Sequence, residues 1–142
     1  MATFDLTPYQ QPTVIQRVLF NAKTIAIVGL SGNPLRASNF VGLYLQRHGY
    51  RIIPVNPLET QVLGETSHPD LDSVPDAVDI VNIFRRSEFV PEIVEAAIRK
   101  GAKVVWMQEG VIHEGAARRA AEAGLTVVMD RCILKDHRRL SQ

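Results

Sequence analysis

The chain has 142 residues and a net charge of +1, and 46% of its residues are hydrophobic and 22% charged, proportions typical of a soluble globular protein. We expect one domain spanning 1–142. No apolar stretch reaches the length of a membrane span, and the first eleven residues lack the pattern of a signal peptide. The single cysteine, Cys132, excludes an internal disulfide and a cysteine-rich metal cluster, so we expect a cytoplasmic protein without a bound metal.

Apolar runs of strand length alternate with amphipathic segments along the chain. We expect a helix over 14–21 capped by Thr13, and then a strand at 25–28 that is central in the sheet. A short strand or turn at 62–64 interrupts the less periodic region between 59 and 76. The other expected strands are 51–55, 78–84, 103–107 and 125–129. The other expected helices are 38–48, a segment capped by Ser87 and ending at Gly101, 114–123 and 133–140. This alternation predicts an α/β, three-layer Rossmann-like domain with a mainly parallel five-stranded sheet.

The segment 29–38 reads Gly-Leu-Ser-Gly-Asn-Pro-Leu-Arg-Ala-Ser and joins the first strand to a helix. Small residues and an open helix start are typical of a phosphate site. The segment is a poor dinucleotide fingerprint, because Ser31 and Pro34 replace the second and third glycines, and no Walker Gly-Lys-Ser/Thr follows. An anion site and an ordinary turn therefore both remain open here.

Charge is distributed unevenly. No acidic residue lies between Asp5 and Glu59, whereas 59–130 holds thirteen acids and seven bases. Five bases lie in the acid-free stretch: Arg17, Lys23, Arg36, Arg47 and Arg51. This pattern indicates an anionic partner, with solvated surface charge as the alternative. The bases are dispersed and the isoelectric point is about 8.0, which disfavours nucleic acid.

Ligands of parallel sheets bind beyond the carboxyl ends of the strands. Asn56-Pro57 follows the second expected strand, and Arg85 and Arg86 follow the third. Together with Arg36, the two arginines would form an anion site; solvated caps beside the next helix are the alternative. Dinucleotide enzymes usually place Asp or Glu where Asn56 stands, which counts against NAD.

Several sequence blocks together resemble the small bacterial and archaeal CoA-binding proteins. They are the segment 29–38, the stretch Tyr-Arg-Ile-Ile-Pro-Val-Asn-Pro, and the later Asp-Ile-Val-Asn-Ile-Phe-Arg-Arg, Val-Val-Trp-Met-Gln-Glu-Gly and Asp-Arg-Cys. That family consists of single Rossmann-like domains similar to the CoA-binding domain of the succinyl-CoA synthetase α subunit, and the resemblance covers about residues 13–135. It implies that Gly29, Ser31, Asn33, Arg36 and Ser38 hold CoA phosphates, while Gly32, Asn56, Pro57, Phe84, Arg85 and Arg86 complete the site. Glu109 departs from the pattern, and its carboxylate would repel phosphate.

The resemblance implies binding of CoA or an acyl-CoA, and no reaction. We expect no catalytic residues, no membrane partner and no nucleic acid partner. The four histidines read as caps, turns or surface residues: His48, His68, His113 and His137. Cys132 reads as a slow, buried thiol. Two alternatives stay open, namely a small NAD(P)-dependent oxidoreductase and an acyl-CoA enzyme that uses Cys132. The charge distribution also predicts that the 3′-phosphate of CoA adds to its affinity.

Overall fold

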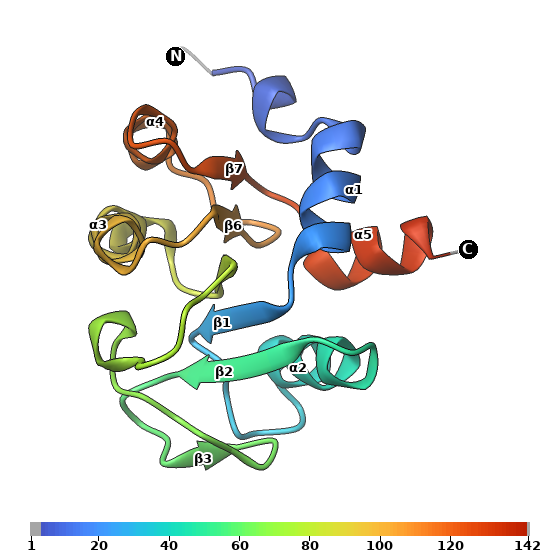
Figure 1. Cartoon of the computed structure of the whole chain (residues 1–142), viewed down its shortest axis with the longest axis vertical. Coiled ribbons are helices and arrows are strands. Elements are labelled where there is room, and N and C mark those ends of the chain that lie inside the picture. Colours follow the sequence, from blue (N-terminus) through green and yellow to red (C-terminus); the bar gives the residue numbers. More distant parts are fainter. Residues whose placement is uncertain (1–3, 142) are drawn as a thin grey trace.

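A computed structural model describes residues 4–141 as one parallel sheet covered by helices (Figure 1). The five strands stand in the order β2-β1-β5-β6-β7, and all neighbouring pairs are parallel. They are β1 (Thr24–Val28), β2 (Arg51–Val55), β5 (Ile80–Ile83), β6 (Val104–Met107) and β7 (Thr126–Val128). The predicted Rossmann-like architecture is confirmed. The expectation of a central first strand is correct only in that β1 has a neighbour on each side, because the middle strand is β5.

Five helices form the two outer layers. They form two groups, one on each side of the sheet (Figure 1). The first group is α1 (Pro12–Asn21), α2 (Ala37–Arg47) and α5 (Ile133–Leu140), and the second is α3 (Val90–Lys100) and α4 (Glu114–Glu122). Short 3-10 turns occupy Thr7–Tyr9, Leu71–Ser73 and Ser87–Phe89. None of the helices in the described part of the chain is both long and apolar enough to cross a membrane.

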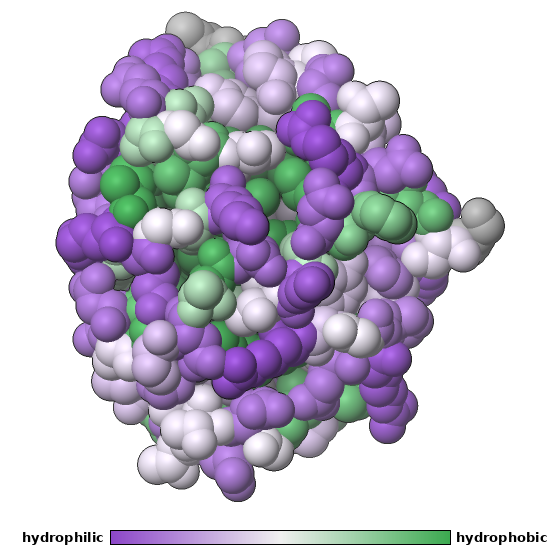
Figure 2. All heavy atoms as spheres, viewed as in Figure 1, coloured by the Kyte–Doolittle hydropathy of each residue, from purple (hydrophilic) through white to green (hydrophobic). Residues whose placement is uncertain are grey.

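Both faces of the sheet are buried because helices cover each of them. Side chains alternate across a strand, so Ile25 and Ile27 face α1, α2 and α5, while Ala26 and Val28 face α3 and α4. Trp106 is fully buried among the first set and donates its indole N–H to the Arg131 carbonyl, 2.8 Å away. The apolar runs that the sequence shows are therefore the inner layer. On the outside, Figure 2 shows apolar atoms mainly in gaps between hydrophilic residues.

Two expected helix starts differ from the structure. Helix α1 begins at Pro12 rather than after a Thr13 cap, since proline suits a first turn that lacks N–H partners. Ser87 does not cap a helix: its hydroxyl accepts the Ile112 N–H at 3.0 Å, and a 3-10 turn precedes α3. The second difference arises because the Ile112 N–H takes the hydroxyl that would otherwise cap the helix.

The weakly periodic region holds a small antiparallel hairpin. Its strands are β3 (Gln61–Val62) and β4 (Glu65–Thr66), joined through Leu63 and Gly64 with φ of 54° and 80°. Two consecutive positive φ values are the conformation of a tight hairpin turn. The segment after the hairpin lies beside the carboxyl end of β2, since Asn56 N–H donates to the His68 carbonyl at 2.8 Å and Val55 pairs with His68 in an isolated parallel bridge.

Candidate functional site

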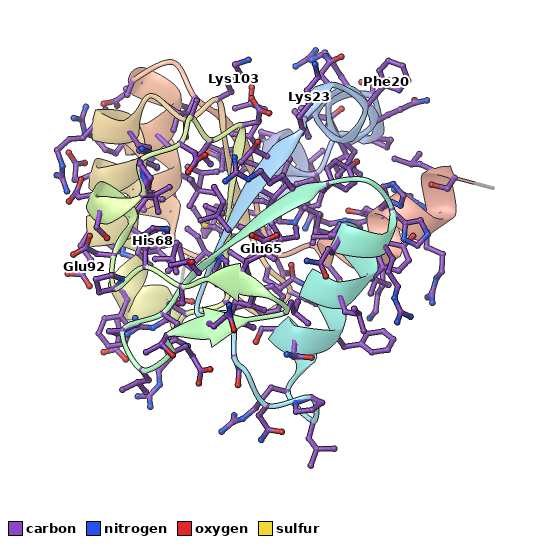
Figure 3. The ribbon with its side chains drawn as sticks, turned by 60° about the horizontal axis from the view of Figure 1, so that its bottom comes forward. Phe20, Lys23, Glu65, His68, Glu92 and Lys103 are labelled. Atoms are coloured by element: carbon purple, nitrogen blue, oxygen red, sulfur yellow. The ribbon has the colours of Figure 1, made fainter. Side chains whose placement is uncertain are left out.

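All five strands of the sheet run in the same direction, so their carboxyl ends share one edge. Figure 3 shows Lys23 and Lys103, which precede β1 and β6, close together at one end of the molecule, with Glu92 and His68 farther from that end. The segments that follow the strands therefore meet near each other. The site is built from these segments.

The loop between β1 and α2 passes very close to β5. Gly29 has φ of +93°, and a Cβ placed on it would lie 2.7 Å from the Phe84 carbonyl oxygen. Phe84 N–H in turn donates to the Val28 carbonyl at 2.9 Å. Only glycine tolerates both the positive φ and the close approach to the Phe84 carbonyl. Gly29 therefore determines the path of the loop.

Polar side chains of the loop hold its own backbone. Ser38 Oγ accepts the Ser31 N–H and Ser31 Oγ accepts the Asn33 N–H, both at 3.0 Å. Asn33 Oδ1 accepts the Leu35 N–H at 2.9 Å. The three expected phosphate ligands Ser31, Asn33 and Ser38 thus also brace the loop. Asn39, which the sequence analysis missed, adds another brace by donating to the Ser31 carbonyl at 2.9 Å.

The start of α2 offers free donors beside Arg36. Within residues 4–141, the backbone N–H groups of Ala37 and Ser38 have no hydrogen-bond partner, as expected for the first turn of a helix. Arg36 precedes them, is exposed and makes no ion pair with another described residue. Two amides, the helix dipole and a guanidinium together make a site suited to an anion.

Asn56 ties the second strand end to this loop. Its Nδ2 donates to the Leu30 carbonyl at 3.0 Å, and its Oδ1 accepts the Leu58 N–H at 2.9 Å. The turn continues when Glu59 N–H donates to the Asn56 carbonyl at 3.3 Å. Asn56 therefore has a bracing role in the edge, while Pro57 lines a hollow described below.

A cleft of about 840 Å³ opens between this loop, the β5 and β6 ends and helix α5. Its basic lining residues are Arg36, Arg85, Lys135 and Arg138, against one acid, Glu109. Its apolar lining includes Leu35, Phe40, Val41, Phe84, Val111 and Leu134. The apolar rim residues Leu35 and Phe40 are 92% and 64% exposed, which is unusual for such large side chains. The cleft suits a ligand that is anionic in one part and apolar in another.

The two expected arginines point to different places. Arg85 lines the cleft and its guanidinium lies 4.4 Å from the centroid of the Phe89 ring, a cation–π contact that orients it. Arg86 has an 84% exposed side chain and lies 3.7 Å from Glu88. It lines none of the hollows at this edge. Consecutive residues at a strand end diverge, so only Arg85 joins Arg36 in the cleft.

Glu109 lies in the cleft but its charge is balanced. Lys135 from α5 donates to its carboxylate at 3.1 Å. Beside it, Gln108 is 6% exposed, and its Oε1 accepts the Asn82 Nδ2 at 3.2 Å and the Ile133 N–H at 3.4 Å. These contacts position the start of α5. The sequence analysis missed the cleft residues of α5, although the four basic residues between 131 and 139 were a signal that could have found them.

The fifth strand end is fixed by a buried ion pair. Asp136 is 2% exposed, and Arg131 Nε donates to its Oδ2 at 3.1 Å. This hydrogen bond raises the pKa of Arg131 above its ordinary value. Asp130 adopts φ of 60° and accepts the Gly110 N–H at 2.7 Å. The two contacts anchor Cys132, which is half-buried and lines the cleft instead of being buried as the sequence analysis expected.

The histidines have other partners. His113 caps α4, because its Nδ1 accepts the Ala116 N–H at 3.0 Å. The His137 ring lies 2.8 Å from the Tyr44 hydroxyl, and the His48 ring stacks on Tyr44 with centroids 3.9 Å apart. Burial, and then the charge of His48, lower the pKa of His137. No group of three or more His, Cys, Asp or Glu residues within 4–141 is placed to hold a metal ion.

A second hollow of about 310 Å³ lies on the α3 side of the same edge. Val28, Val55 and Pro57 give it apolar walls, and Arg85 lines both hollows. Outside both hollows, the Glu59 carboxyl carbon would lie 3.1 Å from a Cβ placed on Gly32 in the loop that follows β1. The sequence has Asn56 where dinucleotide enzymes usually have Asp or Glu, but an acid, Glu59, follows three residues later and lies against the loop. A turn, which sequence spacing does not reveal, brings it back to the loop.

The family comparison matches residues 23–138, almost the whole fold and every segment of the site, to the CoA binding domain. The chain belongs to the CoA binding domain family. The resemblance that the sequence blocks indicated is thereby confirmed.

Three relatives are similar to this chain over different shares of their own length. An uncharacterized protein of Bacillus subtilis, YneT, is 42% identical over 87% of this chain and 91% of its own length. The structure of a hypothetical protein from Pyrococcus horikoshii superimposes with a TM-score of 0.92 at 39% identity, covering all of both chains. The ADP-forming acetate–CoA ligase II of Archaeoglobus fulgidus is 30% identical over 70% of this chain, which spans only 15% of the ligase.

Proposed function

We propose that this protein binds CoA or an acyl-CoA across the carboxyl edge of its sheet and catalyses no reaction of its own. The observation that carries the proposal is the cleft of about 840 Å³, which combines four basic side chains with an apolar rim. CoA has the same division, since it joins a diphosphate to a long pantetheine chain. Membership of the CoA binding domain family supports the same ligand.

Each part of CoA has a matching surface. The free amides of Ala37 and Ser38, with Arg36, would hold the diphosphate. Leu35 and Phe40 would cover the pantetheine or acyl chain in the cleft. The adenosine would enter the smaller hollow, whose walls include Val28 and Val55. Because Arg85 lines both hollows, a single extended ligand can reach across it.

Thermal unfolding with two ligands tests the proposal. NADH is the sharpest competitor, because the Glu59 carboxylate beside Gly32 could accept a ribose hydroxyl as in dinucleotide enzymes. We expect CoA at one hundred times its dissociation constant to stabilise the fold by about 2.7 kcal/mol, and NADH to have no effect. Stabilisation by NADH without an effect of CoA would favour the oxidoreductase alternative.

The position of Cys132 in the cleft favours one second candidate, an acyl-CoA enzyme. In that reaction the thiolate would attack the thioester carbonyl, forming an acyl-cysteine and releasing the CoA thiolate. We expect no CoA release from acetyl-CoA above the uncatalysed rate. Release that disappears in Cys132→Ser would establish the enzyme instead.

A further inference from the structure

Gln108 directly follows β6 and lines the larger cleft, although it is only 6% exposed. Two donors fix the orientation of its side-chain amide. The Ile133 backbone N–H, 3.4 Å away, can only donate, so the oxygen Oε1 faces it. The Asn82 Nδ2 donates to the same oxygen at 3.2 Å, and the Trp106 carbonyl, which accepts from that Nδ2, fixes the Asn82 amide in turn. The Gln108 Nε2 is therefore turned away from these partners.

The Gln108 Nε2 carries two hydrogens and makes no hydrogen bond within residues 4–141. Among the described side chains, the Asn82 Oδ1 alone is both fully enclosed and without a partner. The unpartnered Nε2 therefore keeps an opening, and the cleft is the hollow that Gln108 lines. A donor with so little access to water is costly to leave unpaired. An acceptor atom of a ligand in the cleft would satisfy it.

Helix α5 begins beside Gln108 and adds further donors. The backbone N–H groups of Leu134 and Lys135, two residues that line the cleft, have no partner within residues 4–141, as expected for a first helical turn. The Lys135 side chain is paired with Glu109 at 3.1 Å, so the two charges offset each other at the start of the helix. An uncharged carbonyl oxygen can meet these donors without the repulsion that Glu109 would exert on a second carboxylate.

The spacing of the strands indicates which carbonyl of the proposed ligand reaches this wall. Strand β5 stands between β1 and β6, and neighbouring strands lie about 4.8 Å apart, so the ends of β1 and β6 are about 10 Å apart. Pantetheine joins three units through two amide bonds, and its extended length is about that of three residues, roughly 10 Å. With the diphosphate at the start of α2, the far end of the pantetheine reaches Gln108. In an acyl-CoA that end carries the thioester.

We infer that Gln108 and the start of α5 hold the thioester carbonyl oxygen of an acyl-CoA, so that the protein binds acyl-CoA more tightly than free CoA. The inference rests on the proposed function and refines its ligand to CoA thioesters. Free CoA has no acceptor oxygen at its thiol end, so the Gln108 Nε2 and the two free amides of α5 stay unpaired when it binds. Gln108 acts here as a specificity-determining residue, and no bond of the ligand changes.

Calorimetric titration of the wild-type protein with acetyl-CoA and S-ethyl-CoA tests the inference. S-ethyl-CoA is a thioether that lacks the carbonyl oxygen but keeps the carbon atoms, the diphosphate and the adenosine, so the ratio of the two affinities isolates that oxygen. We expect acetyl-CoA to bind about three- to tenfold more tightly, the size of a neutral hydrogen bond. A third titration, with free CoA and a reductant, should give an affinity close to that of S-ethyl-CoA.

Gln108→Glu is the decisive variant. It keeps an oxygen for the Ile133 N–H and the Asn82 amide but replaces the free NH₂ group by a second oxygen, so it should abolish the preference for acetyl-CoA. Gln16→Glu is the matched control, because it makes the same chemical change on an exposed side chain of α1 that lies outside the cleft. This control should keep the wild-type ratio. Melting curves without ligand show that each variant is folded.

The wild-type ratio needs no substitution and decides by itself. Equal affinities for acetyl-CoA and S-ethyl-CoA in the wild type would overturn the inference while leaving CoA binding intact. An unchanged ratio in folded Gln108→Glu would overturn it as well, since the carbonyl would then have another partner. Binding of none of the three ligands would refute the proposed function together with the inference.

Discussion

Replacing Arg36 by alanine should weaken CoA binding without weakening the fold. Arg36 lines the cleft at the start of α2, next to the two free backbone amides. A hydrogen bond to a charged partner contributes about 1.5–3 kcal/mol. Because Arg36 is exposed, we take the low end, about 1.5 kcal/mol, which is a loss of affinity slightly greater than tenfold. The melting temperature without ligand should stay the same, since such surface changes usually shift stability by less than about 0.5 kcal/mol.

Calorimetry with a matched variant gives this prediction its control. Arg86→Ala removes the same charge fifty residues away in the sequence, from a side chain that lines neither hollow. We expect it to bind CoA within about twofold of the wild type, since exposed pairs contribute little. Equal weakening in Arg36→Ala and Arg86→Ala would show that only net charge matters. Unchanged affinity in Arg36→Ala would remove Arg36 from the site.

Two further predictions concern stability. Gly29→Ala should cost more unfolding free energy than Gly49→Ala: φ is positive at both, +93° and +94°, but only at Gly29 would a Cβ meet the Phe84 carbonyl. The left-handed conformation alone costs about 1–2 kcal/mol, so chemical denaturation giving equal losses would contradict the close-approach argument. His137 has a lowered pKa when folded, so the unfolded chain binds more protons below about pH 6.5, and stability should fall as pH decreases through that range. His137→Gln should flatten this slope in denaturation at several pH values, and an unchanged slope would assign it to other groups.

The secondary structure was predictable where a segment's own residues decide it. Strand β2 begins and ends as expected because Pro57 follows a short β-branched run, and α5 matches over its full length. Prediction failed where a distant partner decides. Ser87 was expected to cap a helix, but the Ile112 amide takes its hydroxyl. Likewise, a turn places Glu59 beside Gly32 although 27 residues separate them in the sequence.

For the candidate site, the sequence predicted which segments meet at the carboxyl edge of the sheet, but not which way each side chain points there. The loop serines and Asn33 were expected to hold phosphates, and their observed contacts brace the loop. The sequence alone does not distinguish Arg85 from Arg86. Their opposite directions at the strand end place only Arg85 in the cleft. The basic residues Lys135 and Arg138 of α5 can be read from the sequence, but their place in the cleft depends on how α5 packs against the sheet.

Helix α5 gives the cleft a further property that concerns folding. The wall containing Leu134, Lys135 and Arg138 is about a hundred residues further along the chain than the opposite wall around Leu35. Joining such distant segments carries a loop-closure cost that only the finished sheet offsets. A partly folded chain, or one still emerging from the ribosome before α5, has the loop between β1 and α2 but only half of the cleft. The proposed ligand would therefore bind completely folded molecules and not compact intermediates, and its presence during folding would favour the former.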